Sequence, residues 1–331
     1  MSSDPSSRWS LGRREFLTIG TGMFVGLTLP LALRRRVSVT KRTLPVMGTI
    51  AEIQVAHPNV QLAEHAIDAA IAELRWVDHT MSRFRSTSDI GRANLGAARE
   101  AVIVGPETAL VVRRALQWAS VSDGRFDPAI GEVSELWDVL HRHEPPPPPQ
   151  VKRLAGRNFW RKVDVSTFGG KPALRYDDRD IHLDLGAIAK GYSIDRATDA
   201  LRARGIAHAI VTVGGDLYAL GGSPEGEPWK VGIRDPRDLS AISRTLDVAD
   251  RAVTTSGDYE RFFRYRGVRY DHLMDPVTGA PRRTPIHSNT VIGDCAMDSD
   301  AASTSGFGLT REAATALARR MIPGAEAIPL T

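Results

Sequence analysis

Asp300 and Thr304 have the residue types and the spacing of a metal site. The sequence predicts a helix from Asp298 through Thr304, and residues four apart on a helix lie on the same face. A carboxylate and a hydroxyl are hard oxygen ligands, which suit Mg²⁺ rather than zinc. The pattern is short, and a helix face exposed to water is the alternative interpretation.

Lys190 is predicted at the start of another helix. Residues 181–185 alternate apolar and polar side chains as a half-buried strand does, and Gly186 ends that strand. Apolar residues then recur at helical spacing up to Gly205: Ile194, Ala197 and Leu201. Free backbone N–H groups, the positive end of the helix dipole and an ammonium group meet there, so the sequence predicts a phosphate-binding position. A surface lysine on an ordinary amphipathic helix is the alternative.

The elements that position these residues are strands and helices in mixed order. The first half of the sequence predicts a strand over residues 50–55, followed by a helix that is capped by Asn59 and has an apolar stripe reaching Met81. A polar loop is predicted over residues 82–94, and a second helix from Pro106 to just before Gly124. The second half predicts strands at residues 209–213, 229–233, 244–248 and 288–292, and a last helix over residues 311–321. Residues 253–259 are predicted as a turn of small residues that can present hydroxyl and N–H groups to an anion.

Five consecutive prolines, residues 145–149, predict a short polyproline spacer within a surface insertion over residues 144–150. A domain boundary is the alternative, but elements of similar character lie on both sides. His141 and His143 precede the prolines and could contact a metal, although an exposed pair of loop histidines is the favoured interpretation.

The composition is typical of a folded protein and gives no sign of nucleic-acid binding. The chain has 331 residues, 42% of them hydrophobic, and a net charge of +4. Residues 1–36 contain six arginines against Asp4 and Glu15, so they carry the whole excess and the remainder is neutral. We therefore expect no nucleic-acid partner. Cys295 is the only cysteine, which excludes an intramolecular disulfide and fits packing at a strand end better than a catalytic thiol.

Residues 1–36 are predicted to be a targeting segment. Residues 12–17, G-R-R-E-F-L, form a twin-arginine pattern, and eighteen uncharged residues follow from Phe16 to Leu33. The segment predicts export by the twin-arginine translocase to the periplasm. A single uncleaved membrane anchor is the alternative, because the apolar run is just long enough to span a bilayer.

The sequence contains neither a P-loop nor a G-x-G-x-x-G fingerprint. Eight segments in order instead resemble the ApbE-type FAD:protein FMN transferases, over nearly the whole chain after residue 46. They are Met47-Gly48-Thr49, Met81-Ser82-Arg83-Phe84 with Ser88-Asp89, Phe126-Asp127-Pro128, the run from Asp184 to Tyr192, Gly214-Gly215-Asp216, the run from Thr255 to Glu260, the run from His272 to Pro276 with Thr278-Gly279, and Asp300 with Thr304.

The resemblance implies a single α+β domain over residues 37–331, tunnelling-fold-like, with mixed or antiparallel sheets packed against helices. It also implies a transferase that cleaves FAD, moves the FMN half to a threonine or serine hydroxyl of a client protein and releases AMP. The implied Mg²⁺ ligands are the Ala187 carbonyl, Asp300 and Thr304. The implied FAD-contacting residues are Met47, Phe84, Arg125, Phe126, Asp127, Asp184, Lys190, Thr255, Ser256, Gly257 and Leu273.

His272 is the candidate to accept the proton of the client hydroxyl, because histidine titrates near neutral pH; a structural histidine in the turn that follows is the alternative. The family usually has tyrosine at the position of Phe84. The phenylalanine keeps a ring face for stacking but lacks the hydroxyl group. The residues after Thr304, Ser305 to Gly308, are more polar than the family's usual apolar run.

The implied clients are periplasmic or membrane electron-transfer proteins with a D-x-x-[ST]-G-A-T acceptor. This chain has D-P-V-T-G-A-P at residues 275–281, where proline replaces the acceptor threonine, so we expect no self-modification. Twin-arginine export resembles the branch that serves nitrous-oxide respiration. Two other functions stay open: an FAD pyrophosphatase, which yields FMN and AMP, and a carrier that binds FAD without cleaving it.

Overall fold

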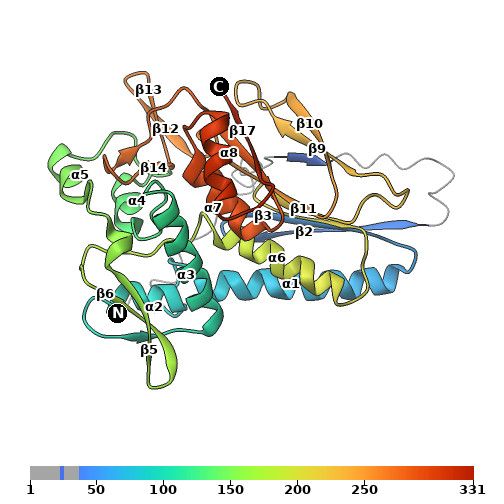
Figure 1. Cartoon of the computed structure of the whole chain (residues 1–331), viewed down its shortest axis with the longest axis horizontal. Coiled ribbons are helices and arrows are strands. Elements are labelled where there is room, and N and C mark those ends of the chain that lie inside the picture. The colour runs from blue at the N-terminus through green and yellow to red at the C-terminus, as the bar shows by residue number, and fades with distance from the viewer. Residues whose placement is uncertain (1–22, 26–36) are drawn as a thin grey trace, which may run out of the picture.

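A computed structural model describes residues 23–25 and 37–331, and the centre of this part of the chain is an antiparallel sheet of seven strands (Figure 1). Every neighbouring pair in the sheet is antiparallel. The order across the sheet is β17 (Glu326–Leu330), β16 (Ser288–Gly293), β11 (Arg251–Gly257), β8 (Asp216–Leu220), β7 (Ala209–Val213), β3 (Thr49–His57) and β2 (Ser38–Val46). The predicted α+β class with antiparallel sheets is confirmed.

Both faces of the sheet are covered. Helices α1 (Val60–Met81) and α6 (Ala189–Arg202) pack on one face, where they share a core with Val211 of β7. On the other face, Ile210 packs with β9 (Trp229–Arg234) and β10 (Ile242–Val248), which form a second sheet with β1 (Met23–Val25). Successive residues of a strand point to opposite faces, so β8 is buried along its whole length.

A second layer of short elements lies beside the ends of α1 and α6 (Figure 1). Its core contains the large buried side chains of Trp118, Phe159 and Tyr176. It contains the helices α2 (Asp89–Gly96), α3 (Pro106–Val121), α4 (Gly131–Trp137) and α5 (Pro148–Leu154), a 3₁₀ turn (Phe159–Lys162), and the strands β4 (Val102–Ile103), β5 (Val163–Phe168) and β6 (Lys171–Tyr176). The remaining elements are the pairs β12 (Phe262–Tyr265) with β13 (Val268–Asp271) and β14 (Met274–Asp275) with β15 (Ala280–Pro281), and the helices α7 (Ala296–Gly306) and α8 (Arg311–Arg319).

Local sequence signals explain where the long helices begin. The Asn59 side chain accepts a hydrogen bond of 3.0 Å from the Leu62 N–H and caps α1 as predicted. Pro106 begins α3 as predicted, because the first turn of a helix needs no proline N–H. The predicted stripe on α1 is buried: Ala66, Ile67, Ala70, Ile71, Leu74, Val77 and Met81.

Three local predictions are wrong. The predicted loop over residues 82–94 contains the start of α2, because the Ser88 hydroxyl accepts a hydrogen bond of 2.8 Å from the Gly91 N–H and caps a short helix. Residues 181–185 alternate in burial but form only one bridge, between His182 and Ile130, since the Asn94 side chain bonds both the N–H and the C=O of Leu183. Residues 253–257 belong to strand β11 rather than to a turn.

The five prolines do not all form the predicted polyproline spacer, because the last two belong to a helix. Pro147 precedes α5 and Pro148 begins it, so the run ends inside the first helical turn, where a missing N–H costs nothing. Residues 147–150 are exposed, whereas Pro146 is buried.

The predicted targeting segment lies mostly outside the described residues. Met23–Val25 is the exception, since these residues pair with Val231–Ile233 of β9 as an antiparallel strand. Within residues 23–25 and 37–331, no helix combines the length and the apolar character needed to cross a membrane. The targeting function of residues 1–36 stays a prediction.

Candidate active site

Three separate elements meet at the Lys190 ammonium group. Lys190 lies in the first turn of α6, as predicted, and its Nζ lies 2.5 Å from an Asp216 carboxylate oxygen. The two carboxylate oxygens of Asp300, on α7, lie 3.0 and 3.1 Å from the same Nζ. Asp216 is the first residue of β8, after the turn that joins β7 to β8. The fold therefore brings residues 190, 216 and 300 into one ionic cluster.

The cluster is buried on its acidic side and open on its basic side. The side chains of Asp216 and Asp300 are 2% and 4% exposed, whereas that of Lys190 is 25% exposed. Burial lowers the pKa of Lys190, but the charges of Asp216 and Asp300 outweigh this and raise it above its ordinary value. Burial raises the pKa of Asp300 although Lys190 opposes the shift. A permanent ammonium group therefore faces two carboxylates at a partly open position.

The predicted metal ligands fit a hard divalent cation. Thr304 follows Asp300 by one helical turn on α7, and its hydroxyl lies 2.9 Å from the Ser256 hydroxyl of β11. An Asp300 oxygen accepts a hydrogen bond of 3.1 Å from the Gly191 N–H, which fixes the carboxylate at the start of α6. Ala187 lies in the turn before that helix. These donors are oxygens, the atoms that Mg²⁺ prefers.

Strand β11 supports the cluster from the sheet. The Thr255 N–H donates a hydrogen bond of 2.8 Å to Asp216, and the Thr255 hydroxyl lies 2.8 Å from that of Thr290. Gly257 packs against Tyr259, since a Cβ there would lie 2.6 Å from the ring and the ring would have to move. Residues 255–257, which the resemblance places near the cofactor, therefore lie in a strand beside Asp216 and Thr304.

Two arginines hold the end of α7 just beyond Thr304. Arg125 donates hydrogen bonds of 3.1 and 2.9 Å to the carbonyls of Ser305 and Phe307. Arg282 donates to the carbonyls of Thr304 and Phe307 at 2.9 and 3.1 Å. A helix ends with unpaired carbonyls and negative dipole charge, so both cations stabilise it. The polar sequence after Thr304 is therefore held by two arginines from outside the helix.

Phe126 and Asp127 are part of the protein interior beside Arg125. Phe126 is 3% exposed. One Asp127 oxygen accepts a hydrogen bond of 2.8 Å from the Ala129 N–H, and the other lies 3.3 Å from the Trp160 N. Burial raises the pKa of Asp127 to about 6 despite these hydrogen bonds. Both residues therefore position the loop before α4.

An exposed aromatic ring lies near Asp184. The Phe84 side chain is 74% exposed, and the Arg83 guanidinium lies 4.2 Å from its ring centroid. The same arginine lies 3.0 Å, through its Nε, from an Asp184 carboxylate oxygen. The predicted positions 84 and 184 are therefore connected, and Phe84 offers a ring on which a planar ligand can stack.

Met47 occupies the turn between β2 and β3. Its φ angle of 53° is in the left-handed region, as is that of Gly48 at 67°. The Gly48 carbonyl accepts a hydrogen bond of 3.2 Å from Arg261. The hydrogen bond from Arg261 thus holds the turn that contains Met47.

His272 has an available ring nitrogen. Its Nδ1 is buried and has no hydrogen-bond partner within residues 23–25 and 37–331. Burial lowers the pKa of His272 to about 4, and the charges of Arg261 and Lys190 act in the same direction. The ring is therefore neutral at neutral pH, as a proton acceptor must be. Leu273 is buried, and its N–H donates a hydrogen bond of 2.8 Å to Asp271.

Sequence reasoning assigned no role to Asp216, Arg282 or Arg83. The Gly-Gly-Asp segment signalled Asp216 as part of the resemblance, but its contact with Lys190 depends on strand pairing between β8 and β11. Arg282 follows the predicted turn over residues 275–281 without a spacing pattern that marks it.

Gly191→Ala should disturb the cluster through packing. A Cβ at residue 191 would lie 2.1 Å from the Ala296 carbonyl oxygen, so the first turns of α6 and α7 would have to separate. Overpacking of this kind costs about 1–3 kcal/mol. Denaturant unfolding should show that loss. Gly96→Ala is the control, because its Cβ meets only a Val102 methyl group at 3.1 Å; equal stability of the two variants would contradict the packing argument.

The sequence is similar to those of known proteins. The sequence matches the profile of the ApbE family over residues 47–329. It is 32% identical over 334 residues to the FAD:protein FMN transferase of Treponema pallidum, covering 97% of this chain and 90% of that protein. It is 30% identical over 279 residues to the FAD:protein FMN transferase of Vibrio cholerae, covering 83% of this chain and 82% of that protein.

Solved structures share the fold. The crystal structure of an ApbE protein from Thermotoga maritima superimposes with a TM-score of 0.80 at 28% identity, covering 88% of this chain and 94% of that one. The flavin transferase ApbE from Vibrio cholerae superimposes with a TM-score of 0.74 at 26% identity, with the same two coverages, 88% and 94%.

Proposed function

Because the chain belongs to the ApbE family, we propose that it transfers FMN from FAD to a hydroxyl group of a client protein and releases AMP. The observation that carries this proposal is the cluster of Lys190, Asp216 and Asp300 beside the hydroxyls of Thr304 and Ser256. It combines a fixed cation with hard oxygen donors, which is the equipment that phosphoryl transfer requires.

Asp300, Thr304 and the Ala187 carbonyl are the residues that would hold Mg²⁺. When bound, the ion neutralises charge on the phosphate oxygens of FAD and on the departing AMP. Lys190 contributes a second positive charge from the open side of the cluster. Its contacts with Asp216 and Asp300 hold the ammonium group in place before substrate arrives, so little reorganisation is needed.

In the proposed reaction, the client hydroxyl oxygen forms a bond to the phosphorus of the FMN half. The bond from that phosphorus to the bridging oxygen breaks, and AMP departs with both bonding electrons. The hydroxyl proton passes to the imidazole ring of His272. His272 suits this role because burial keeps it neutral. Phe84 supplies an exposed ring for the flavin, with Arg83 and Asp184 beside it.

The client and the location extend this proposal. The twin-arginine pattern in residues 12–17 supports export to the periplasm, where electron-transfer proteins with a D-x-x-[ST]-G-A-T acceptor are the proposed clients. The related segment of this chain, residues 275–281, is partly paired as β14 and β15 and has proline at its last position. It is therefore not proposed as an acceptor.

Product analysis tests the function. The purified chain is incubated with FAD and Mg²⁺, with and without an acceptor domain, and AMP, FMN and FAD are separated by chromatography. We expect AMP only with the acceptor, in an amount equal to the FMN that the acceptor gains. Equal free FMN and AMP with two unrelated acceptors unmodified would replace the proposal with an FAD pyrophosphatase. Intact FAD bound to the protein would replace it with a carrier.

His272→Ala should lower the transfer rate by about 10²–10⁴-fold, the usual contribution of a positioned proton acceptor. FAD affinity should change little, because the variant keeps Phe84 and Lys190. Protonation of His272 should not affect the wild-type rate above about pH 4, where the pKa of His272 lies. Below that pH the ring is protonated and the rate should fall. His141→Ala is the control, since His141 is an exposed histidine paired with Asp138. A normal rate in His272→Ala would exclude His272 as the base.

A further inference from the structure

Three potential metal ligands converge away from the Lys190 cluster. Glu132 and Glu135 lie on α4, and His182 lies in the segment before Asp184. One ligand atom of each lies within 4.8 Å of the others, and in the described part of the chain no other three His, Cys, Asp or Glu residues do this. We propose that Glu132, Glu135 and His182 form a second metal site, which binds a Zn²⁺-type cation.

The two separations between His182 and the glutamates match the edges of a tetrahedral site. His182 Nδ1 lies 3.4 Å from Glu132 Oε2 and 3.3 Å from Glu135 Oε2. Zinc bonds to nitrogen and carboxylate oxygen are about 2.0–2.1 Å long, and the edge of a tetrahedron with such bonds is about 3.3–3.4 Å. A charge-assisted hydrogen bond between nitrogen and oxygen would be shorter, about 2.7–2.9 Å. These two separations therefore fit ligands around an ion and are longer than a short charge-assisted hydrogen bond.

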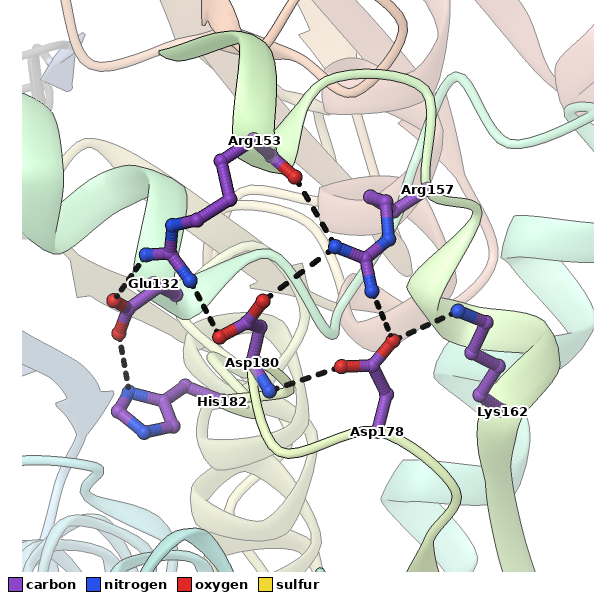
Figure 2. A network of polar contacts seen from close by, with 7 residues as sticks. All are labelled: Glu132, Arg153, Arg157, Lys162, Asp178, Asp180 and His182. Carbon is purple, nitrogen blue, oxygen red and sulfur yellow. Dashed lines mark hydrogen bonds and ion pairs between the residues drawn. The ribbon is translucent and has the colours of Figure 1, made fainter. Parts of the chain in front are cut away.

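Arginines leave the inner carboxylate oxygens free for the ion. Arg153 contacts Glu132 through Oε1 at 3.3 Å, and Arg83 contacts Glu135 through Oε1 at 2.7 Å. The Oε2 atoms of both glutamates face His182. Figure 2 shows the arginine and the imidazole on opposite oxygens of Glu132. Each arginine thus orients a ligand from behind, as groups around metal ligands do.

The backbone holds His182 close to α4. The Gly131 N–H donates a hydrogen bond of 2.8 Å to the His182 carbonyl, and a Cβ at residue 131 would lie 2.7 Å from that carbonyl oxygen. Only glycine permits this approach. On the far side, Arg153 bonds Asp180 at 2.5 Å, and Arg157 and Lys162 bond Asp178 (Figure 2). The segment that carries His182 is therefore fixed from both sides.

The donor set selects a different ion from that of the Lys190 cluster. One imidazole nitrogen with two carboxylates suits zinc and similar transition metals, whereas Asp300 and Thr304 offer only hard oxygens. Three protein ligands leave a fourth position open. Arg83 also contacts Asp184, so the second site adjoins a proposed flavin-contacting residue. A metal binds the neutral imidazole, so a proton competes with the cation for His182.

Zinc titration of the full chain tests the proposal. The protein is freed of metal by a chelator and returned to excess Mg²⁺, and Zn²⁺ binding is measured by calorimetry at about pH 8, above the ordinary pKa of histidine. We expect one zinc ion bound per chain at this site. His182→Ala and Glu132→Gln should each weaken zinc binding at least about tenfold, since even loss of a group behind a ligand costs 10–100-fold.

A matched histidine provides the control. His141 is exposed and pairs with one carboxylate, that of Asp138, so His141→Ala should leave zinc affinity unchanged. Circular dichroism checks that each variant is folded. If His182→Ala does not fold, Glu132→Gln still tests the proposal, because glutamine has the same size as glutamate. Absence of zinc binding by the wild-type chain would overturn the proposal. Equal affinity in wild type and Glu132→Gln would also overturn it.

Discussion

Asp300→Asn should lower FMN transfer by about 10³-fold, the upper range for losing one electrostatic contact to a transition state. The substitution removes the only charged ligand among the three proposed Mg²⁺ ligands and keeps an oxygen that can accept the Gly191 N–H. It also leaves Lys190 with Asp216 as its remaining carboxylate partner. The initial rate of AMP release at saturating FAD, across a Mg²⁺ titration, measures the effect.

Thr304 offers a matched pair of controls for this result. Thr304→Ser keeps the hydroxyl that contacts Ser256 and should retain most activity, whereas Thr304→Val removes it at similar volume and should raise the Mg²⁺ requirement. Unfolding curves for all three variants separate loss of activity from loss of folding. A folded Asp300→Asn variant with near wild-type rate would contradict the placement of the metal.

Lys190→Met should destabilise the fold by about 3–5 kcal/mol at neutral pH, the cost of removing one partner from a buried ion pair. Asp216 and Asp300 are almost fully buried and would lose their shared cation. Without Lys190, the pKa of Asp300 in the folded state would rise further above its unfolded value. The loss of folding stability in Lys190→Met is therefore largest at pH values above that raised pKa. It becomes smaller as the pH falls through that pKa, because Asp300 is then protonated and uncharged. Urea unfolding at several pH values measures this.

A surface pair supplies the control for Lys190. Lys230 and Asp247 also form an ion pair, but their side chains are 61% and 58% exposed. Lys230→Met should therefore change stability by less than about 1 kcal/mol. Adding Asp216→Asn to Lys190→Met should restore part of the lost stability, because it removes one uncompensated charge. Similar losses for Lys190→Met and Lys230→Met would show that the cluster is not a buried ionic centre.

The sequence predicted the parts of the site that depend on helical periodicity. Lys190 was placed at a helix start by the apolar spacing after Gly186, and Asp300 and Thr304 were placed on one face by their separation. Their contact with each other was not derivable, because it depends on the crossing of α6 and α7 at Gly191 and Ala296.

Other features depended on long-range pairing. The turn predicted over residues 253–259 is mostly strand β11, because β16 pairs with residues 252–257 and overrides the turn-like small residues, while β8 pairs with residues 251–253. The helix α2 was missed because its apolar face is short, with Ile90 and Ala93 buried. Arg125 reaches the end of α7 from 180 residues earlier in the chain, and Arg282 reaches it from 22 residues earlier, which no local pattern encodes.

Intact-mass analysis of an acceptor tests the central claim most directly. A client domain or peptide with a D-x-x-T-G-A-T sequence is incubated with the chain, FAD and Mg²⁺, and its mass is measured before fragmentation locates the modified residue. We predict a mass gain equal to one FMN joined by a phosphoester bond to the threonine, absent with Asp300→Asn. An acceptor that stays unmodified while FAD is consumed, or one modified equally by Asp300→Asn, would contradict the account.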